Sequence, residues 1–197
     1  MELRNIKISD KELTLTNVEV NVVGPEVVFE RCTVHSDCAG GALIVAGLTM
    51  VEGEFIQKRR LANFHFSRAH FHGVKFSGKF VGCDFGDWDT TEKASVQGCD
   101  FSQATLDGCR FLNCDMQTIR IPKWPCFTIF NPSQARDFVL GRDWPSSVGD
   151  ILDVYTDEDP ECVAICSDAV RIAEKNSVPL EEFRELLLIV PGIRISE

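Results

Sequence analysis

The fold is decided by residues 94–121, which read ASVQGCDFSQATLDGCRFLNCDMQTIRI. A small or apolar residue and, two positions later, a large apolar one recur there every five residues. The large residues are Val96, Phe101, Leu106, Phe111, Met116 and Ile121. A period of five fits neither an α-helical turn of about 3.6 residues nor the two-residue period of a strand. The pattern therefore indicates an internal repeat.

Each five-residue unit has a period of two over its first three residues. In an extended segment, residues two apart point to the same face, so Cys99 and Phe101 face inward while Asp100 faces outward. The other two residues of a unit, such as Asp107-Gly108, are mostly polar or glycine, as residues at corners are. A short strand and a corner, repeated, predict a coil that winds around a filled interior.

The units Cys99–Gln103, Ala104–Gly108 and Cys109–Asn113 resemble pentapeptide repeats, in which a small residue, a polar residue and a Leu or Phe precede two variable residues. The resemblance implies an all-β repeat, a right-handed quadrilateral β-helix with four units in each coil. The residues expected to fill its core are Phe66, Phe71, Phe76, Phe80, Phe85, Val96, Phe101, Leu106, Phe111, Met116 and Ile121.

The repeat is regular over residues 64–121 and degenerate over residues 1–60. We expect about six coils of about twenty residues within residues 1–131, from Leu13 onward. An acidic helical cap or appendage is expected over residues 132–197. Gly24-Pro25 and Asp37–Gly40 break the phase of the repeat briefly, and two longer stretches interrupt it. Gly53–Ala62, which contains Lys58-Arg59-Arg60, is interpreted as a protruding loop, and Gly86–Lys93 as an insertion.

An open coil exposes unpaired strand edges and apolar core, so both ends need a cover. The strand Ile6–Ile8 is expected to cover the first end. Helices are expected to cover the other. Their predicted starts are Ser133 (with an end at Leu140), Ser147, Asp159-Pro160-Glu161 (leading through Cys162 and Cys166) and Ser177-Val178-Pro179.

Composition narrows the class of protein. The 197 residues fit one domain, or one domain with an appendage. No apolar run approaches a membrane span and Met1–Asn5 does not begin a signal peptide, so we expect a cytoplasmic protein without membrane contact. The nine cysteines include no CxxC pair and are expected to be reduced. Five of them stand at small inward positions: Cys32, Cys83, Cys99, Cys109 and Cys114.

The negative charge is concentrated in the last third of the chain. The net charge of −10 divides into −3 for residues 1–59, +1 for residues 60–131 and −8 for residues 132–197. The regular repeat is therefore nearly neutral, and the tail is acidic.

Two groups of residues are candidates for a metal site. His65, His70 and His72 are interpreted as surface histidines, because a corner between adjacent units points His65 and His70 in different directions. The acids of the insertion, Asp84, Asp87, Asp89 and Glu92, lack the glycine and the closing glutamate of an EF-hand loop. We expect neither a metal nor another cofactor.

Other candidate residues are few. Trp88 in the insertion either anchors a protein partner or folds back against the coil. The bases Lys58, Arg59 and Arg60 give too weak an electrostatic pattern for nucleic-acid binding, which we do not expect. No catalytic or phosphate-binding motif is present, so we expect no enzyme.

Three functions remain open. The first is a non-catalytic binding protein that docks on a protein partner and inhibits or neutralises it, as an immunity factor does; the acidic tail would suit a basic partner. Its expected docking residues, besides Trp88, are Asp157, Glu158, Asp159 and Glu161. The second follows from the resemblance: one branch of the family, associated with fluoroquinolone resistance, mimics DNA and binds topoisomerase. The near-neutral repeat disfavours it. The third is an enzyme with an unrecognised site.

The oligomeric state is also open. The chain is expected to be a monomer, or a dimer joined through its C-terminal helices, where the apolar run Leu186–Val190 could form the seam.

Overall fold

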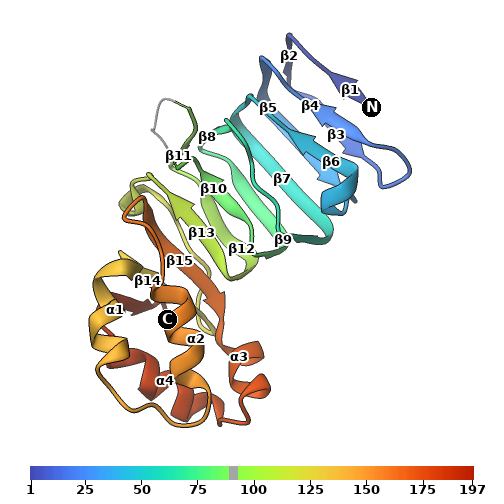
Figure 1. Cartoon of the computed structure of the whole chain (residues 1–197). Coiled ribbons are helices and arrows are strands. Elements are labelled where there is room, and N and C mark those ends of the chain that lie inside the picture. Colours follow the sequence, from blue (N-terminus) through green and yellow to red (C-terminus); the bar gives the residue numbers. More distant parts are fainter. Residues whose placement is uncertain (89–92) are drawn as a thin grey trace.

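The computed structural model describes residues 1–88 and 93–197. It is a β-solenoid of about 5 turns with helices at the C-terminus, as the repeat predicted, although about six turns were expected. Figure 1 shows the N-terminus at the free end of the coil and the C-terminus within the cap at the other end. None of the helices among the described residues is long and apolar enough to cross a membrane.

The coil is built of parallel strands joined by corners, with one 3₁₀ turn inside it and a second after its last strand. Its strands are β1 (Glu2–Leu3), β2 (Ile6–Ser9), β3 (Glu12–Leu15), β4 (Asn21–Val23), β5 (Val27–Ser36), β6 (Leu43–Val45), β7 (Leu48–Ala62), β8 (His70–His72), β9 (Lys75–Val81), β10 (Asp84–Gly86), β11 (Ser95–Gln97), β12 (Asp100–Asp107) and β13 (Cys109–Leu112). The 3₁₀ turns are η1 (Gly40–Ala42) before β6 and η2 (Met116–Thr118) after β13.

Successive turns stack in a nearly constant register. Phe55 pairs with Val34 on one side and with Phe76 on the other, and the two neighbours are equally far from it in sequence. Regular turns are therefore of equal length, slightly longer than the four repeat units expected. Lys75 pairs with Asp100 across a longer turn, because that turn contains the insertion Gly86–Lys93.

The coil begins earlier than the sequence analysis expected. Ile6 of β2 pairs in parallel with Val27 of β5, and Glu2 of β1 pairs with Val22 of β4. The strand predicted to cover the first end is therefore the outermost strand of the coil itself. The offset between Ile6 and Val27 matches the spacing of the later regular turns, which explains why this strand joins them instead of lying across them.

Inward side chains form one continuous core. The residues with at most 1% of their surface exposed include Phe66, Phe71, Phe76, Phe80, Phe85, Val96, Phe101, Leu106 and Phe111. Met116 and Ile121 are only half-buried, because no further turn covers them. Rings of successive turns stack on one another: Phe76 and Phe101 have centroids 4.4 Å apart and are tilted by 1°. Such stacking ties each turn to the next.

We expected a loop over Gly53–Ala62. This segment is instead part of the long strand β7. Gln57 pairs with Gly78 and Leu61 with Phe80, so three residues of β7 face one residue of β9. Lys58–Arg60 form an exposed bulge within the strand. The buried Gln57 amide holds this bulge by donating to the carbonyls of Cys38 (2.8 Å) and Arg59 (2.7 Å). A bulge breaks the period of the repeat without ending the strand.

The cap combines strands with helices. Its elements are β14 (Cys126–Phe130), α1 (Pro132–Leu140), α2 (Val148–Thr156), β15 (Cys162–Asp168), α3 (Ala169–Lys175), α4 (Leu180–Leu188) and β16 (Ile193–Ile195). The three strands join two strands of the coil in one sheet of order β10-β13-β15-β14-β16. Helices α1, α2 and α4 appear where the sequence predicted them, although Asn131 precedes α1 in place of the expected Ser133 cap.

The prediction of a helix from Asp159 through Cys166 is wrong, because Cys162–Asp168 form the strand β15. It lies antiparallel between β13 and β14, with Cys166 opposite Cys109 of the coil. The last strand of the coil has unpaired backbone groups at its edge, and a strand satisfies them where a helix cannot. The helix begins only at Ala169, where the Asp168 carboxylate accepts from the N–H of Val170.

The cysteines serve the core. All nine are free thiols; Cys114 is half-buried and the other eight are buried. Burial raises the pKa of Cys99 to about 11 and that of Cys114 to about 12. Cysteine at these positions acts as a small apolar residue.

Candidate protein-docking surface at the coil–cap junction

Arg110 on β13 connects the coil to the cap. Its Nε and one terminal nitrogen donate to the two Asp84 carboxylate oxygens at 2.7 Å and 3.0 Å. Its other terminal nitrogen lies 3.5 Å from the Glu158 carboxylate, in the loop between α2 and β15. Asp84 and Arg110 are register partners in adjacent turns, so the coil fixes the guanidinium before the cap meets it. A two-pronged, partly buried arginine pair of this kind is strongly oriented.

The two carboxylates on Arg110 have opposite pKa shifts. Burial acts to raise the pKa of Asp84, but hydrogen bonds from His65 and Arg110 outweigh it and hold the pKa below its ordinary value. Burial raises the pKa of Glu158 as well. Here the pKa stays above its ordinary value, because the longer contact with Arg110 offsets less of the effect of burial. Asp84 is thus the firm partner of Arg110 and Glu158 the weaker one.

Trp88 folds back against the junction. It packs on the cluster of Leu112, Cys162 and Ile165, and the guanidinium carbon of Arg110 lies 4.9 Å from its ring centroid. The Asn113 amide donates to the carbonyl of Trp88 at 3.1 Å. The structure therefore brings Trp88 and Glu158, which are far apart in sequence, to the same arginine. In this position Trp88 is half-buried and packs beneath Arg110 at the junction of coil and cap.

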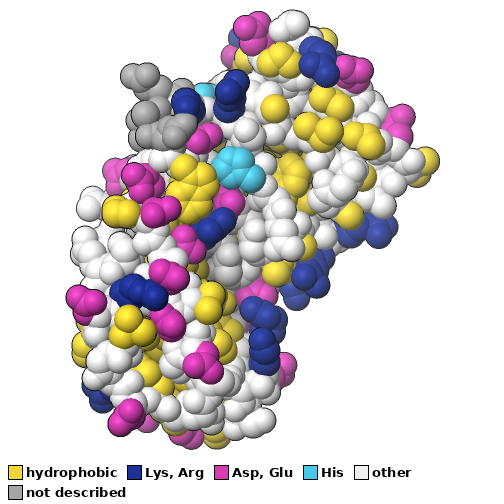
Figure 2. Space-filling view, in the orientation of Figure 1, with side chains coloured by type: hydrophobic (Ala, Val, Ile, Leu, Met, Phe, Trp, Pro, Cys, Tyr) yellow, Lys and Arg dark blue, Asp and Glu magenta, His cyan; other side chains and the backbone are white. Residues whose placement is uncertain are grey.

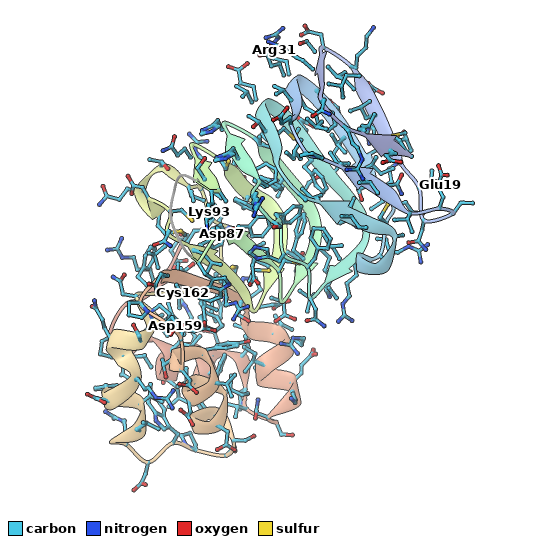
Figure 3. All side chains as sticks on the ribbon, turned by 45° about the horizontal axis from the view of Figure 1, so that its top comes forward. Glu19, Arg31, Asp87, Lys93, Asp159 and Cys162 are labelled. Carbon is cyan, nitrogen blue, oxygen red and sulfur yellow. The ribbon has the colours of Figure 1, made fainter. Side chains whose placement is uncertain are left out.

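The acidic loop, residues 157–161, is held by its backbone. The Asp159 carbonyl accepts from the N–H of Cys162 at 2.9 Å, and the Glu161 carbonyl from the N–H of Asn113 at 2.8 Å. Asp157 pairs with Arg136 at 3.1 Å. The carboxylates of Asp159 and Glu161 make no ion pair with any residue that the structure describes. Figure 3 shows Asp87, Cys162 and Asp159 one after another across the boundary between coil and cap.

An apolar contact point lies beside the acidic loop. Val154 on α2 is 67% exposed. Val154 and Tyr155 border a depression of about 250 Å³, whose other walls include Arg110 and Glu158. We call Arg110, Val154, Tyr155, Glu158, Asp159 and Glu161 the junction surface. An exposed apolar side chain within a charged rim is the usual anatomy of a protein interface.

A second polar network fastens the cap beneath this surface. Asp107 on β12 is 2% exposed and pairs with Arg171 on α3, with an Oδ2–Nε distance of 2.5 Å. Ser167 donates to Asp107 at 3.1 Å and contacts the Tyr155 hydroxyl at 2.9 Å. Burial raises the pKa of Tyr155, so its hydroxyl keeps its proton at neutral pH. The network locks α2 and α3 onto the coil.

The candidate metal ligands are divided among different surroundings. His65 lies 3.5 Å from Asp84 and belongs to the Arg110 network, whereas His70 and His72 both contact the Ser95 hydroxyl, at 2.9 Å and 3.3 Å. Asp89 and Glu92 lie outside the described residues. Among the residues that are described, no group of three or more His, Cys, Asp and Glu could hold a metal ion.

On the face drawn in Figure 2, charges of opposite sign concentrate along different margins. Figure 2 shows acidic side chains gathered along the left margin beside the junction, and Lys and Arg side chains along the right margin where the coil meets the cap. A partner that approaches the junction surface thus meets mostly negative charge.

The fold defines the class of protein: a parallel β-solenoid whose last turn is closed by a mixed cap. A family model described as pentapeptide repeats matches residues 92–119, with 8 copies. The match identifies this stretch as pentapeptide repeats and supports a pentapeptide repeat protein. Comparisons with curated proteins and with solved structures found no match.

Sequence reasoning missed Arg110 and Val154. Arg110 stands at an ordinary outward position of its repeat unit, and the insertion places its partner Asp84 further back in the chain than one regular turn. Val154 lies on a helix that was expected only to cover the end of the coil. The one available signal was that α2 has an extra apolar residue, because Val154 lies beside the stripe formed by Ile151, Leu152 and Tyr155.

Proposed function

We propose that this protein docks on a protein partner through the junction surface and thereby inhibits or neutralises it. Pentapeptide-repeat β-helices are in general non-catalytic structural or binding modules, and the fold suggests a protein-interaction module. The observation that carries the proposal is a pair of carboxylates, Asp159 and Glu161, which form no ion pair with the described residues and stand on a rigid loop next to the exposed Val154. They fit a basic partner with an apolar side chain at the centre of its interface.

Rigidity favours this function. The loop is fixed by two backbone hydrogen bonds, and its neighbour Glu158 by Arg110. A surface that is already ordered loses little conformational freedom on binding, so more of the contact energy appears as affinity. The unpaired carboxylates also accelerate the approach of a basic partner by long-range attraction.

The test begins with capture of the partner from the source cell and continues with calorimetry on the purified pair. We expect the double variant Asp159→Asn/Glu161→Gln to weaken binding at least tenfold while the unfolding midpoint stays unchanged. The matched control is Glu12→Gln/Glu19→Gln, which makes the same charge change at the far end of the coil and is expected to bind normally. Equal affinity of the two double variants would overturn the proposal.

The identity of the captured protein separates the remaining alternatives. A small basic toxin or enzyme that loses activity in the complex supports neutralisation. Topoisomerase bound along the coil, insensitive to the junction variants, would instead support DNA mimicry. Turnover of a substrate in a panel would support an enzyme.

A further inference from the structure

A groove runs along the coil, away from the junction surface. It has a volume of about 730 Å³ and is bordered by residues of consecutive turns, from Arg4 through Pro25 and Ala46 to Ser67, with Lys93 beyond them. Strands of adjacent turns are about 4.8 Å apart, so five such rows span roughly 19 Å. That length accommodates about six residues of an extended peptide at about 3.3 Å each.

One wall of the groove is a column of corner residues. The column consists of Asn5, Glu26, Gly47 and Arg68, one in each turn, and all have left-handed backbone, with φ of 48°, 55°, 81° and 52°. Of these, Glu26, Gly47 and Arg68 line the groove. Gly47 has no side chain, so the column leaves a gap between Glu26 and Arg68. A left-handed arginine costs roughly 1–2 kcal/mol relative to glycine. Glycine would fit this backbone better than Arg68 does.

Arg68 is exposed, and no described residue compensates its charge. Its guanidinium makes no hydrogen bond or ion pair with the residues that the structure describes. The equivalent arginine of the next corner column, Arg31 (φ 49°), is instead held by both oxygens of Asp10 at 2.6 Å and 2.7 Å. Arg68 is therefore the corner arginine that has a charge to offer to a ligand.

The floor of the groove is apolar where a solvent-facing strand is usually polar. Val22 of β4 and Ile44 of β6 are register partners at outward positions, and Ile44 is 49% exposed. Together with Pro25 and Ala46 they form an apolar strip in the middle of the groove. Phosphate-rich ligands gain nothing from such a strip and would meet the Glu26 carboxylate, so nucleic acid fits poorly.

We propose that this groove binds an extended peptide of about six residues that is apolar at its centre and has an Asp or Glu side chain at the end that faces Arg68. The apolar strip accepts the central side chains, and the Arg68 guanidinium pairs with the carboxylate. The site uses none of the residues of the junction surface, so it is independent of the proposed function.

The probe is a pool of acetylated and amidated hexapeptides with Val or Ile at the two central positions and Asp or Glu at one end. A matched pool has Lys in place of the acid. Amidation removes the terminal carboxylate, so a signal from the first pool reports the acidic side chain. We expect the full-length protein to retain peptides of the acidic pool over the lysine pool, read by mass spectrometry after equilibrium dialysis.

Two variants then locate the site, with affinities measured by fluorescence anisotropy on a retained peptide. Arg68→Gly relieves the backbone and removes the charge, so we expect at least fivefold weaker binding with no loss of stability. Ile44→Ser is expected to weaken binding to a similar extent. Arg31→Gly, a corner arginine outside the groove, is the control and should bind normally, as should Asp159→Asn/Glu161→Gln.

Two results would overturn the proposal. One is equal retention of the acidic and lysine pools. The other is equal affinity of Arg68→Gly and the wild-type protein for the retained peptide.

Discussion

Small and large side chains alternate at the inward positions along each face of the coil, and together they fill its interior. Phe101 shows the arrangement: its ring stacks on Phe76 and meets the edges of Phe85 and Phe111 at centroid distances of 4.9 Å and 5.2 Å. Such positions can be predicted from sequence because they repeat. The partners of Arg110 cannot, since its pairing depends on a register that an insertion has shifted.

Truncation of a central ring tests the core. Phe101→Ala removes contacts with three other rings and leaves a cavity in a continuous stack, so we expect a loss of about 3–5 kcal/mol in the free energy of unfolding. The control Gln97→Ala, at an exposed position in the same turn, is expected to change it by less than about 0.5 kcal/mol. Urea unfolding measures both. A loss below about 1 kcal/mol for Phe101→Ala would be inconsistent with a packed interior.

The Asp84 carboxylate gives the protein a defined acid sensitivity. Because its pKa is lower in the folded state than its ordinary value of 3.8, its contribution to stability is complete above that value and is lost as the pH falls through the folded pKa. Glu158, with a raised pKa, acts in the opposite direction and offsets part of the loss.

We therefore expect the stability of the wild-type protein to fall more steeply below about pH 4 than that of Asp84→Asn. At pH 7 the variant should be the less stable of the two, since Arg110 has lost its main partner. Urea titrations at a series of pH values measure this, and parallel curves would contradict it.

At the scale of elements, local pattern and tertiary context disagree in two places. In β15, Ile165 and Cys166 follow Cys162 at spacings that a helix also produces. The segment forms a strand because it pairs with the open edge of β13. In β7, the bulge at Lys58–Arg60 disturbs the period without ending the strand. Sequence reasoning found most of the turns and helices but not these two, because both depend on a neighbouring turn.

Gly78 tests how closely the turns approach one another. Its φ is +101°, and a Cβ there would lie 1.9 Å from the carbonyl oxygen of Gln57 in the turn below. We expect Gly78→Ala to cost more than about 3 kcal/mol or to prevent folding. Gly98 is the matched control: its φ is +62°, but the nearest atom to an added Cβ is 3.8 Å away. Gly98→Ala should cost only about 1 kcal/mol, the strain of the left-handed backbone. Equal costs would show that the two positions are not distinguished by contact between turns.

In the whole molecule, a nearly neutral coil carries an acidic cap. The distribution of charge could be predicted from the sequence. The contacts that attach the cap to the coil could not. Asp107 on the coil and Arg171 on the cap, far apart in sequence, form an ion pair at the centre of that attachment, with the carboxylate buried and the guanidinium half exposed. The coil and cap share one sheet, so they are expected to unfold together.

Arg171→Met tests the attachment. It leaves the buried Asp107 carboxylate without its counter-charge, and because Arg171 is half exposed we expect a loss of about 1–3 kcal/mol in the free energy of unfolding. Adding Asp107→Asn should restore a substantial part of it, because a neutral amide costs less to bury. A double variant as unstable as the sum of its parts would mean that the two residues are not coupled.

The proposed docking through the junction surface is tested most directly by amide hydrogen exchange on the complex with the captured partner. We expect the partner to slow exchange in residues 154–161 and in the neighbouring segments around Asp84 and Arg110, and to leave the first turns of the coil unchanged. Slowed exchange confined to the coil, with residues 154–161 exchanging as fast as in the free protein, would contradict it.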